Sequence, residues 1–154
     1  MIVDVREEER YWYPPDGGIV WLAGYHLVNA ATGAFIPNSA PELVARGIRI
    51  ASVAGADRWH PETLQSEAAR PGAPLTLRRD AENEHDPNAI AVCTPEGQLG
   101  FVPRDLAATL APSLDAGETW SGVVLRERRA SPRDPRTGVT ALFARAASVE
   151  LRVG

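Results

Sequence analysis

Apolar residues alternate with polar ones in short runs along most of the chain, and turn-forming residues separate the runs. A repeat of two residues is typical of β-strands that bury one face. Pro95-Glu96-Gly97 separates two such runs and predicts the turn of a β-hairpin. Taken in order, the predicted strands are 19–28, 34–36, 48–54, 74–79, 89–94, 98–102, 120–128 and 139–149.

Two segments have helical patterns instead. Leu106, Leu110 and Leu114 recur every four residues after Pro103, which predicts a helix from 104 to about 116. Residues 60–69 predict a shorter helix that ends before Pro71-Gly72, and one further helical turn fits residues 42–46. Several short strands with two brief helices favour a small β-barrel over a parallel βαβ sheet.

The barrel prediction also divides the chain. Residues 48–150 hold about six of the predicted strands and both short helices, so we expect them to form the barrel domain. Residues 1–47 are expected to form an N-terminal β-rich extension, with a turn at Pro14–Gly18. Its aromatic residues Tyr11, Trp12, Tyr13 and Trp21 either cover the barrel or form an exposed patch.

Composition narrows the class of protein. The chain has 154 residues and 44% hydrophobic content, enough for one domain with a core. Its apolar runs are far shorter than the ~20 residues of a membrane-spanning helix. The N-terminus lacks the basic start and apolar centre of a signal peptide, and Cys93 is the single cysteine. We therefore expect a cytoplasmic protein without a membrane partner.

The charges give no general attraction for polyanions. The net charge is −4, so any nucleic acid would have to be bound by a local arrangement of residues. All sixteen basic residues are arginine and none is lysine. Each cation is thus a planar group suited to phosphate contacts and to stacking on rings.

The segment between two predicted strands, residues 80–88, is the most informative part of the sequence. It reads Asp-Ala-Glu-Asn-Glu-His-Asp-Pro-Asn, with four acids within seven positions. A simple solvent-exposed turn does not need so many acids, amides and imidazoles together. We expect a shaped binding loop or a tightly hydrogen-bonded turn, in which Asn83 and Asp86 accept hydrogen bonds from backbone amides.

Metal sites and cofactors are not favoured. Counted from Asp80, a calcium loop needs glycine at position six and glutamate at position twelve, where this chain has His85 and Ala91. His26 and His60 are too far from His85 in sequence for a zinc-ligand spacing. We expect no cofactor.

Catalysis is also disfavoured. His85 and Asp86 are adjacent on an extended segment, so their side chains point to opposite faces rather than toward one substrate atom. No activated nucleophile or glycine-rich phosphate loop accompanies them. We expect no enzymatic activity, and the alternative is a metal-dependent phosphoesterase that uses Asp80, Glu82 and Asp86.

Single-stranded nucleic acid fits the residues better. A ring that stacks on a base and guanidinium groups that meet phosphates are the parts of such a site. The alternative is that Phe101 belongs to the core and the arginines are solvated. The candidates near predicted strand ends are Arg58, Trp59, Arg78, Arg79, Phe101 and Arg104.

Residues from about 48 to 124 resemble the HIRAN domain, a module of helicase-like DNA-repair ATPases that also occurs alone in bacterial proteins. The resemblance is carried by Val53-Ala54-Gly55, by Leu75–Asp80 continuing into Asn83–Val92, and by Leu99–Ala107. It implies an OB-like barrel that holds the 3′ end of single-stranded DNA, in DNA repair or processing.

The resemblance also implies roles for single residues. Asp86 would accept a hydrogen bond from the terminal 3′-hydroxyl, and Arg104 would contact a phosphate. Phe101 would line the groove, and Arg58 and Trp59 would occupy two stacking positions. The predicted nucleic-acid-binding set is Arg58, Trp59, Arg78, Arg79, His85, Asp86, Phe101 and Arg104.

The chain departs from the DNA-binding members at the stacking segment. Asp57 stands where those members have an arginine, and Arg58 replaces one aromatic residue. With a one-residue insertion, Arg58 is that arginine and Trp59 with His60 are the two rings. Both registers stay open. A further alternative is a protein–protein interaction domain of a repair or defence complex, which would bind its partner through the barrel groove or the N-terminal aromatic residues.

Overall fold

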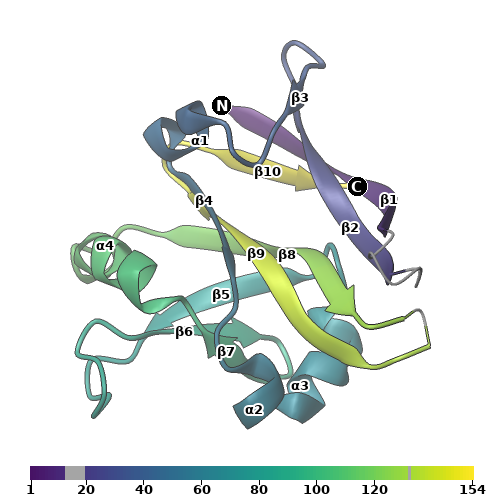
Figure 1. The fold of residues 1–154 in the computed structure, drawn as a ribbon. Helices are drawn as coiled ribbons and strands as arrows, with labels where there is room; N and C mark the ends of the chain where they lie inside the picture. The colour runs from purple at the N-terminus through teal and green to yellow at the C-terminus, as the bar shows by residue number, and fades with distance from the viewer. Residues whose placement is uncertain (13–19, 132) are drawn as a thin grey trace.

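In the computed structural model of the chain, the described residues are 1–12, 20–131 and 133–154, without the side chains of residues 7–12 and 20–23. The turn predicted at Pro14–Gly18 and the side chains of Tyr11, Trp12, Tyr13 and Trp21 lie outside this description. The described part is mainly β with a few short helices, which confirms the predicted fold class (Figure 1).

The described residues form ten strands and five short helices. The strands are β1 (Ile2–Trp12), β2 (Val20–Asn29), β3 (Phe35–Ile36), β4 (Ile48–Ser52), β5 (Pro74–Arg79), β6 (Ile90–Thr94), β7 (Gly97–Phe101), β8 (Trp120–Arg129), β9 (Arg136–Arg145) and β10 (Glu150–Val153). The helices are α1 (Pro41–Arg46), α2 (Ala56–Trp59), α3 (Pro61–Gln65), the 3₁₀ turn η1 (Glu67–Ala69) and α4 (Arg104–Asp115).

Six of the strands follow one another around an incomplete barrel. β4 pairs with β9, β9 with β8, β8 with β5, β5 with β6 and β6 with β7, all antiparallel. Between β7 and β4 there is no continuous ladder, only an isolated bridge between Phe101 and Ala54. The predicted barrel is therefore only approximate, because the sheet is not closed along its length.

The first strands form a second layer above the barrel strands, as Figure 1 shows. β1 pairs with β2, β3 pairs with β2, and β2 meets β8 at Gly24 and Arg126. β10 pairs with β1 in parallel. The predicted final strand 139–149 was wrong at its end, because β9 ends at Arg145 and a separate strand begins at Glu150.

Two hydrophobic cores share β8 and β9. Val124 and Phe143 belong to the core inside the barrel strands, whereas their neighbours Val123 and Leu142 belong to the core beneath β1, β2, β10 and α1. Successive residues of a strand point to opposite faces, so a strand buried on both faces needs an apolar run without alternation. This explains the continuous apolar run 123–125 in β8.

The helices confirm one prediction and correct another. α4 begins and ends within about a residue of the prediction. The helix predicted over 60–69 is instead α3 followed by η1, and α2 precedes it, which the sequence patterns did not indicate. In the described part of the chain, no helix is both long and apolar enough to cross a lipid bilayer.

A buried ion cluster ties α3 to the β8–β9 hairpin. Glu127 forms ion pairs with Arg129 (Oε1 to Nε, 2.8 Å) and with the Nε of Arg136. Arg136 also donates to the carbonyl oxygens of Leu64 and Ser66 at the end of α3. Burial raises the pKa of Glu127, but hydrogen bonds from Arg129 and Arg136 outweigh it and hold the pKa below its ordinary value.

We expect Glu127→Gln to lower the free energy of unfolding by about 3–5 kcal/mol at neutral pH, because it leaves Arg136 buried without a counter-charge. Glu118→Gln is the control, because Glu118 pairs with Arg145 at the surface and should cost less than about 1 kcal/mol. Urea unfolding followed by circular dichroism measures both.

The same experiment has a defined pH dependence. A carboxylate with a lowered folded-state pKa stabilises the fold above its unfolded value, about 4.3, and this stabilisation disappears as the pH falls through the folded-state pKa. The difference between wild type and Glu127→Gln should therefore shrink as the pH is lowered below about 4. A difference that stays constant down to acid pH would contradict the role of this cluster.

Candidate nucleic-acid interface

The loop between β5 and β6 is held by its own side chains. The Oδ1 of Asn83 accepts hydrogen bonds from the backbone N–H groups of His85 (2.9 Å) and Asp86 (3.1 Å). The Oδ1 of Asp86 accepts one from the N–H of Asn88 at 2.9 Å. The turn predicted from Asn83 and Asp86 is confirmed, and it fixes the direction of both side chains.

Arg79 fastens this loop to the rest of the domain. Its guanidinium donates to the carbonyl oxygens of Ala89 (2.9 Å) and Pro87 (3.0 Å), and to the Oδ1 of Asp115 at the end of α4 (2.8 Å). The side chain is only 18% exposed. Its donors are engaged by protein acceptors, so its contribution to the site is to position the loop.

Trp59 is placed by the sharp turn before α2. Gly55 has a φ of +76°, a left-handed conformation that favours glycine, and the Trp59 N–H donates to the Gly55 carbonyl at 3.0 Å. A Cβ atom on Gly55 would collide with the Trp59 ring. The ring thus lies directly over Gly55 and has the Arg58 guanidinium over it, 5.2 Å from its centroid, and Trp59 as a whole is 60% exposed.

The bridge between β4 and β7 brings the two halves of the site together. The Ala54 N–H donates to the Phe101 carbonyl at 2.8 Å, and the Phe101 N–H donates to the Ala54 carbonyl at 2.9 Å. Gly100 is required at this point, because a Cβ there would collide with the carbonyl of Ala54 and with Val53. The bridge sets Trp59, which follows Ala54, opposite Arg104, which follows Phe101.

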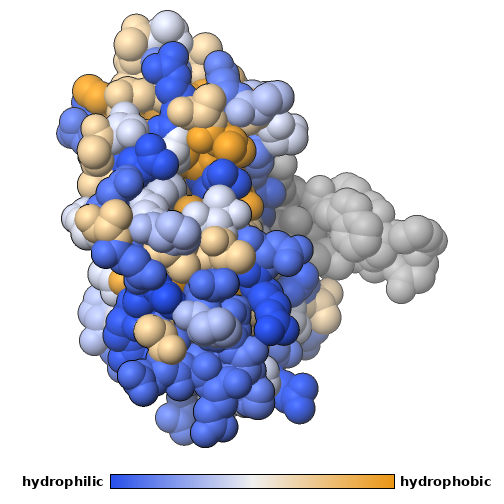
Figure 2. Space-filling view, turned by 90° about the vertical axis from the view of Figure 1, so that its left-hand side faces the viewer, coloured by the Kyte–Doolittle hydropathy of each residue, from blue (hydrophilic) through white to orange (hydrophobic). Residues whose placement is uncertain are grey.

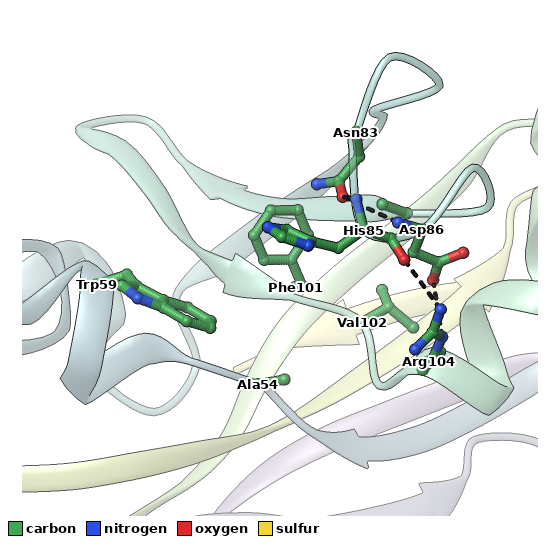
Figure 3. Close-up of a pocket in the computed structure, with 9 residues that line it drawn as sticks. Ala54, Trp59, Asn83, His85, Asp86, Phe101, Val102 and Arg104 are labelled. Atoms are coloured by element: carbon green, nitrogen blue, oxygen red, sulfur yellow. Dashed lines mark hydrogen bonds and ion pairs between the residues drawn. The ribbon is translucent and has the colours of Figure 1, made fainter.

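A cavity of about 240 Å³ lies where these segments meet. Figure 3 shows Trp59 on one side, with Asn83, His85 and Asp86 on the loop and Phe101, Val102 and Arg104 on the segment from β7 to α4. The floor is apolar and the rim carries the charged and polar groups. The lining residues are Ala54, Trp59, Asn83, His85, Asp86, Ala89, Phe101, Val102 and Arg104.

Arg104 crosses the rim from the start of α4. Its Nη2 donates to the carbonyl oxygen of His85 at 2.9 Å, and its Nε lies 3.9 Å from the Oδ2 of Asp86. The Arg104 side chain is 74% exposed, whereas that of Asp86 is 17% exposed. A cation and a carboxylate thus face the same cavity, and their ion pair is long and open to solvent.

Five of the eight predicted residues line the cavity: Trp59, His85, Asp86, Phe101 and Arg104. The other three lie outside its lining. Arg58 lies over the Trp59 ring, Arg79 anchors the loop, and Arg78 donates to the Oε1 of Gln98 at 3.4 Å. Among the residues of α2, Trp59 is the one whose aromatic ring lines the cavity.

Four lining residues were not in the predicted set: Ala54, Asn83, Ala89 and Val102. Asn83 was expected only to close the turn. The small apolar residues have no chemical signal in the sequence. Their position next to the β4–β7 bridge and to the loop could be found only from strand pairing.

The carboxylates do not gather. Within the described ranges, no three histidine, cysteine, aspartate or glutamate side chains come close enough together to hold a metal ion. Asp80 instead accepts a hydrogen bond from the side-chain amide of Asn83 at 3.1 Å. The three carboxylates proposed for a phosphoesterase, Asp80, Glu82 and Asp86, therefore do not converge on one ion.

Residues 54–140 match the family model of the HIRAN domain. The match covers more than half of the chain and contains every residue that lines the cavity. The chain therefore belongs to the HIRAN domain family, as the sequence blocks predicted.

Comparison with single proteins gives shorter or more distant matches. The chain is 50% identical over 48 residues to a Fanconi-associated nuclease 1 homolog from Oryza sativa subsp. japonica, and the match covers 29% of the chain and 5% of that relative. The HIRAN domain of human HLTF has 24% identity and a TM-score of 0.46, covering 67% of this chain and 80% of that one. A Lactobacillus plantarum protein has 21% identity and a TM-score of 0.47, covering 64% and 99%.

The contact between Gly55 and the Trp59 ring can be tested with a matched pair of variants. Gly55→Ala and Gly33→Ala both place alanine at a φ near +75°, but nothing lies within 4 Å of the added atom at Gly33. We expect each to cost about 1–2 kcal/mol of stability for the backbone conformation. Gly55→Ala alone should also displace the Trp59 indole signal in a ¹⁵N correlation spectrum. An unmoved indole signal in folded Gly55→Ala would contradict this placement.

Proposed function

We propose that this domain binds single-stranded DNA and that its cavity receives the 3′ end of the strand. Two observations support the proposal. The chain is a HIRAN domain, and the structure sets an exposed tryptophan, an arginine and a carboxylate around one cavity. These are the groups that stack on a base, contact a phosphate and accept a hydrogen bond from a hydroxyl.

Trp59 is the stacking residue of this proposal. Trp59 is 60% exposed at the cavity edge, so a base can reach its ring, where it would displace the Arg58 guanidinium that lies over the ring. Stacking on an aromatic side chain contributes about 1–3 kcal/mol per base. Phe101 is half-buried in the floor, where it offers an apolar surface to a sugar or to a second base.

Arg104 is the phosphate-binding residue. Its guanidinium has donors beyond the one that reaches the His85 carbonyl, and it is the cation that lines the cavity. Arg58, whose guanidinium lies over the Trp59 ring, supplies a second cation, which moves to the phosphate that follows the stacked base. We propose that Arg78 contacts the strand farther from the cavity and that Arg79 acts through the loop.

Asp86 recognises the end of the strand. Its Oδ1 is used within the loop, whereas among the described residues its Oδ2 has the long contact to Arg104 and is otherwise available to a hydroxyl donor. A 3′-phosphate at this place would meet the carboxylate as a like charge. The proposal therefore predicts discrimination between a 3′-hydroxyl and a 3′-phosphate.

We propose that the domain acts by binding alone, without a cofactor, and that it serves DNA repair or processing together with a separate enzyme. With a net charge of −4 and few cations at the cavity, affinity should be weak and strongly salt-dependent. No observation on the described residues favours the phosphoesterase alternative.

Trp59→Leu should weaken binding of a fluorescein-labelled oligothymidylate about 5- to 100-fold, because a stacked base is lost. Phe35→Leu is the matched control, because Phe35 is an exposed aromatic residue away from the cavity.

Arg104→Ala should lower the slope of log affinity against log salt concentration by about 0.7, which corresponds to the loss of one phosphate contact. Arg70 does not line the cavity, so Arg70→Ala is the control and should leave the slope unchanged. Fluorescence anisotropy measures both. Equal effects of site and control variants would contradict the assignment.

Asp86→Asn should remove any preference for a 3′-hydroxyl over a 3′-phosphate oligonucleotide, because the amide no longer repels the phosphate. The turn should persist, since the asparagine Oδ1 can still accept from the Asn88 N–H. Anisotropy titrations with the two oligonucleotides at low salt give the preference. If it persists in Asp86→Asn, another residue reads the end. If wild type binds neither oligonucleotide, the proposed function is wrong.

A further inference from the structure

Among the described residues, strand β4 (Ile48–Ser52) is paired along only one of its two edges, by β9. β4 pairs with β9 in antiparallel, and the Val53 N–H donates to the carbonyl of Val139 at 3.0 Å. This hydrogen bond shows which residues of β4 turn their backbone groups toward β9. Backbone groups of alternate residues in such a pair point to opposite sides. The N–H and C=O groups of Ile50 and Ser52 therefore point away from β9.

The reason this edge stays open lies at the end of β7. Ala54 pairs with Phe101, so the next outward-pointing residue of β4, Ser52, would pair with Pro103. Proline has no N–H to donate, and α4 begins at Arg104 and leads the chain away from the edge. In the described part of the chain, no strand pairs with β4 on this side.

A groove of about 320 Å³ borders the open edge, and it shares no residue with the cavity of the DNA site. We call it the β4 groove. One wall is α1 with the loop before it, and the other carries Leu106 of α4. Figure 2 shows the face of the molecule that carries α1 and α4, and hydrophobic residues gather in the upper half of this face. The lining residues are Asn38, Ser39, Ala40, Pro41, Leu43, Val44, Ile48, Arg49, Ile50, Ala51 and Leu106.

The exposed lining gives the groove a defined chemistry. Val44 is 52% exposed and Leu106 and Ile50 are half-buried, so both walls offer apolar surface. Arg49 also lines the groove, and no ion pair joins it to any of the described acids. A ligand that fits must supply backbone donors and acceptors, alternating apolar side chains and a negative charge.

An extended polypeptide meets these requirements and a nucleic acid does not. A strand that pairs with an open edge gains main-chain hydrogen bonds, and its alternate side chains enter pockets on the two faces. We propose that the β4 groove binds an extended segment of a partner protein by strand addition to β4. Its apolar side chains contact Val44 and Leu106, and an acidic side chain pairs with Arg49.

The test begins with selection of random ten-residue peptides displayed on phage against the full chain. The proposal predicts enriched peptides that alternate apolar residues, carry an acidic residue, and lack proline at the paired positions. A synthetic peptide of the enriched sequence should protect the amides of Ile50 and Ser52 from hydrogen exchange. These amides should exchange freely in the unbound protein.

A matched pair of variants separates main-chain pairing from side-chain contact. Ser52→Pro removes one outward N–H and leaves the pairing with β9 intact, so it should lower the affinity for the selected peptide about tenfold or more. Ser52→Ala keeps the N–H and should bind the peptide with wild-type affinity. Arg49→Glu should lower the affinity for acidic peptides, and Val44→Glu should lower the affinity for all selected peptides. Oligothymidylate binding at the cavity should be unchanged by these substitutions.

Three results would overturn the proposal. One is a selection that enriches no peptide. Another is that the selected peptide protects backbone amides of β10 or β7 from hydrogen exchange and leaves those of Ile50 and Ser52 unprotected. The third is an unbound chain that is dimeric with these amides already protected, which would make a second copy the occupant. If Ser52→Pro does not fold, the exchange pattern of the wild type with its peptide decides the question.

Discussion

Two hydrogen bonds between Ala54 and Phe101 hold the candidate site together. Ladders join the six strands from β4 round to β7, and among the described residues the Ala54–Phe101 bridge is the pairing that connects the end of the β4 segment to β7. It sets the segment that carries Trp59 against the segment that leads to Arg104. Gly100 allows the approach, because any side chain there would collide with the Ala54 carbonyl. The bridge therefore helps to set how the two halves of the cavity face each other, together with the packing of α2 and α3 on β7.

The β5–β6 loop and the Glu127 ion cluster hold the segments on either side of this bridge in position. On one side, Asn83 and Arg79 fix the direction and the position of the loop that carries Asp86. On the other side, the Glu127 cluster fastens α3 to the β8–β9 hairpin. It thereby helps to hold α2, which carries Trp59 and directly precedes α3. The chemistry of the site therefore also depends on residues that do not line the cavity, such as Arg79 and Glu127.

Most of the strands and the turn of residues 80–88 could be predicted from the sequence, because alternation of apolar residues and asparagine or aspartate in turns are local signals. β10 could not, since it depends on parallel pairing with β1, at the other end of the chain. The function of Arg79 was also hidden, because its partner Asp115 lies at the end of a separate helix. The same holds for the open edge of β4, which follows from where Pro103 falls in the pairing and not from any motif.

We propose that the bridge gathers Trp59, Asp86 and Arg104 around a cavity that receives a DNA strand. Chemical-shift mapping of the ¹⁵N-labelled chain with a short oligothymidylate can detect such binding residue by residue. If the strand enters the cavity, the Trp59 indole and the backbone amides of His85, Asp86 and Phe101 should shift together with one titration curve, while those of β1 and β10 stay unmoved. Shifts confined to another surface, or no shifts at saturating oligonucleotide, would contradict it.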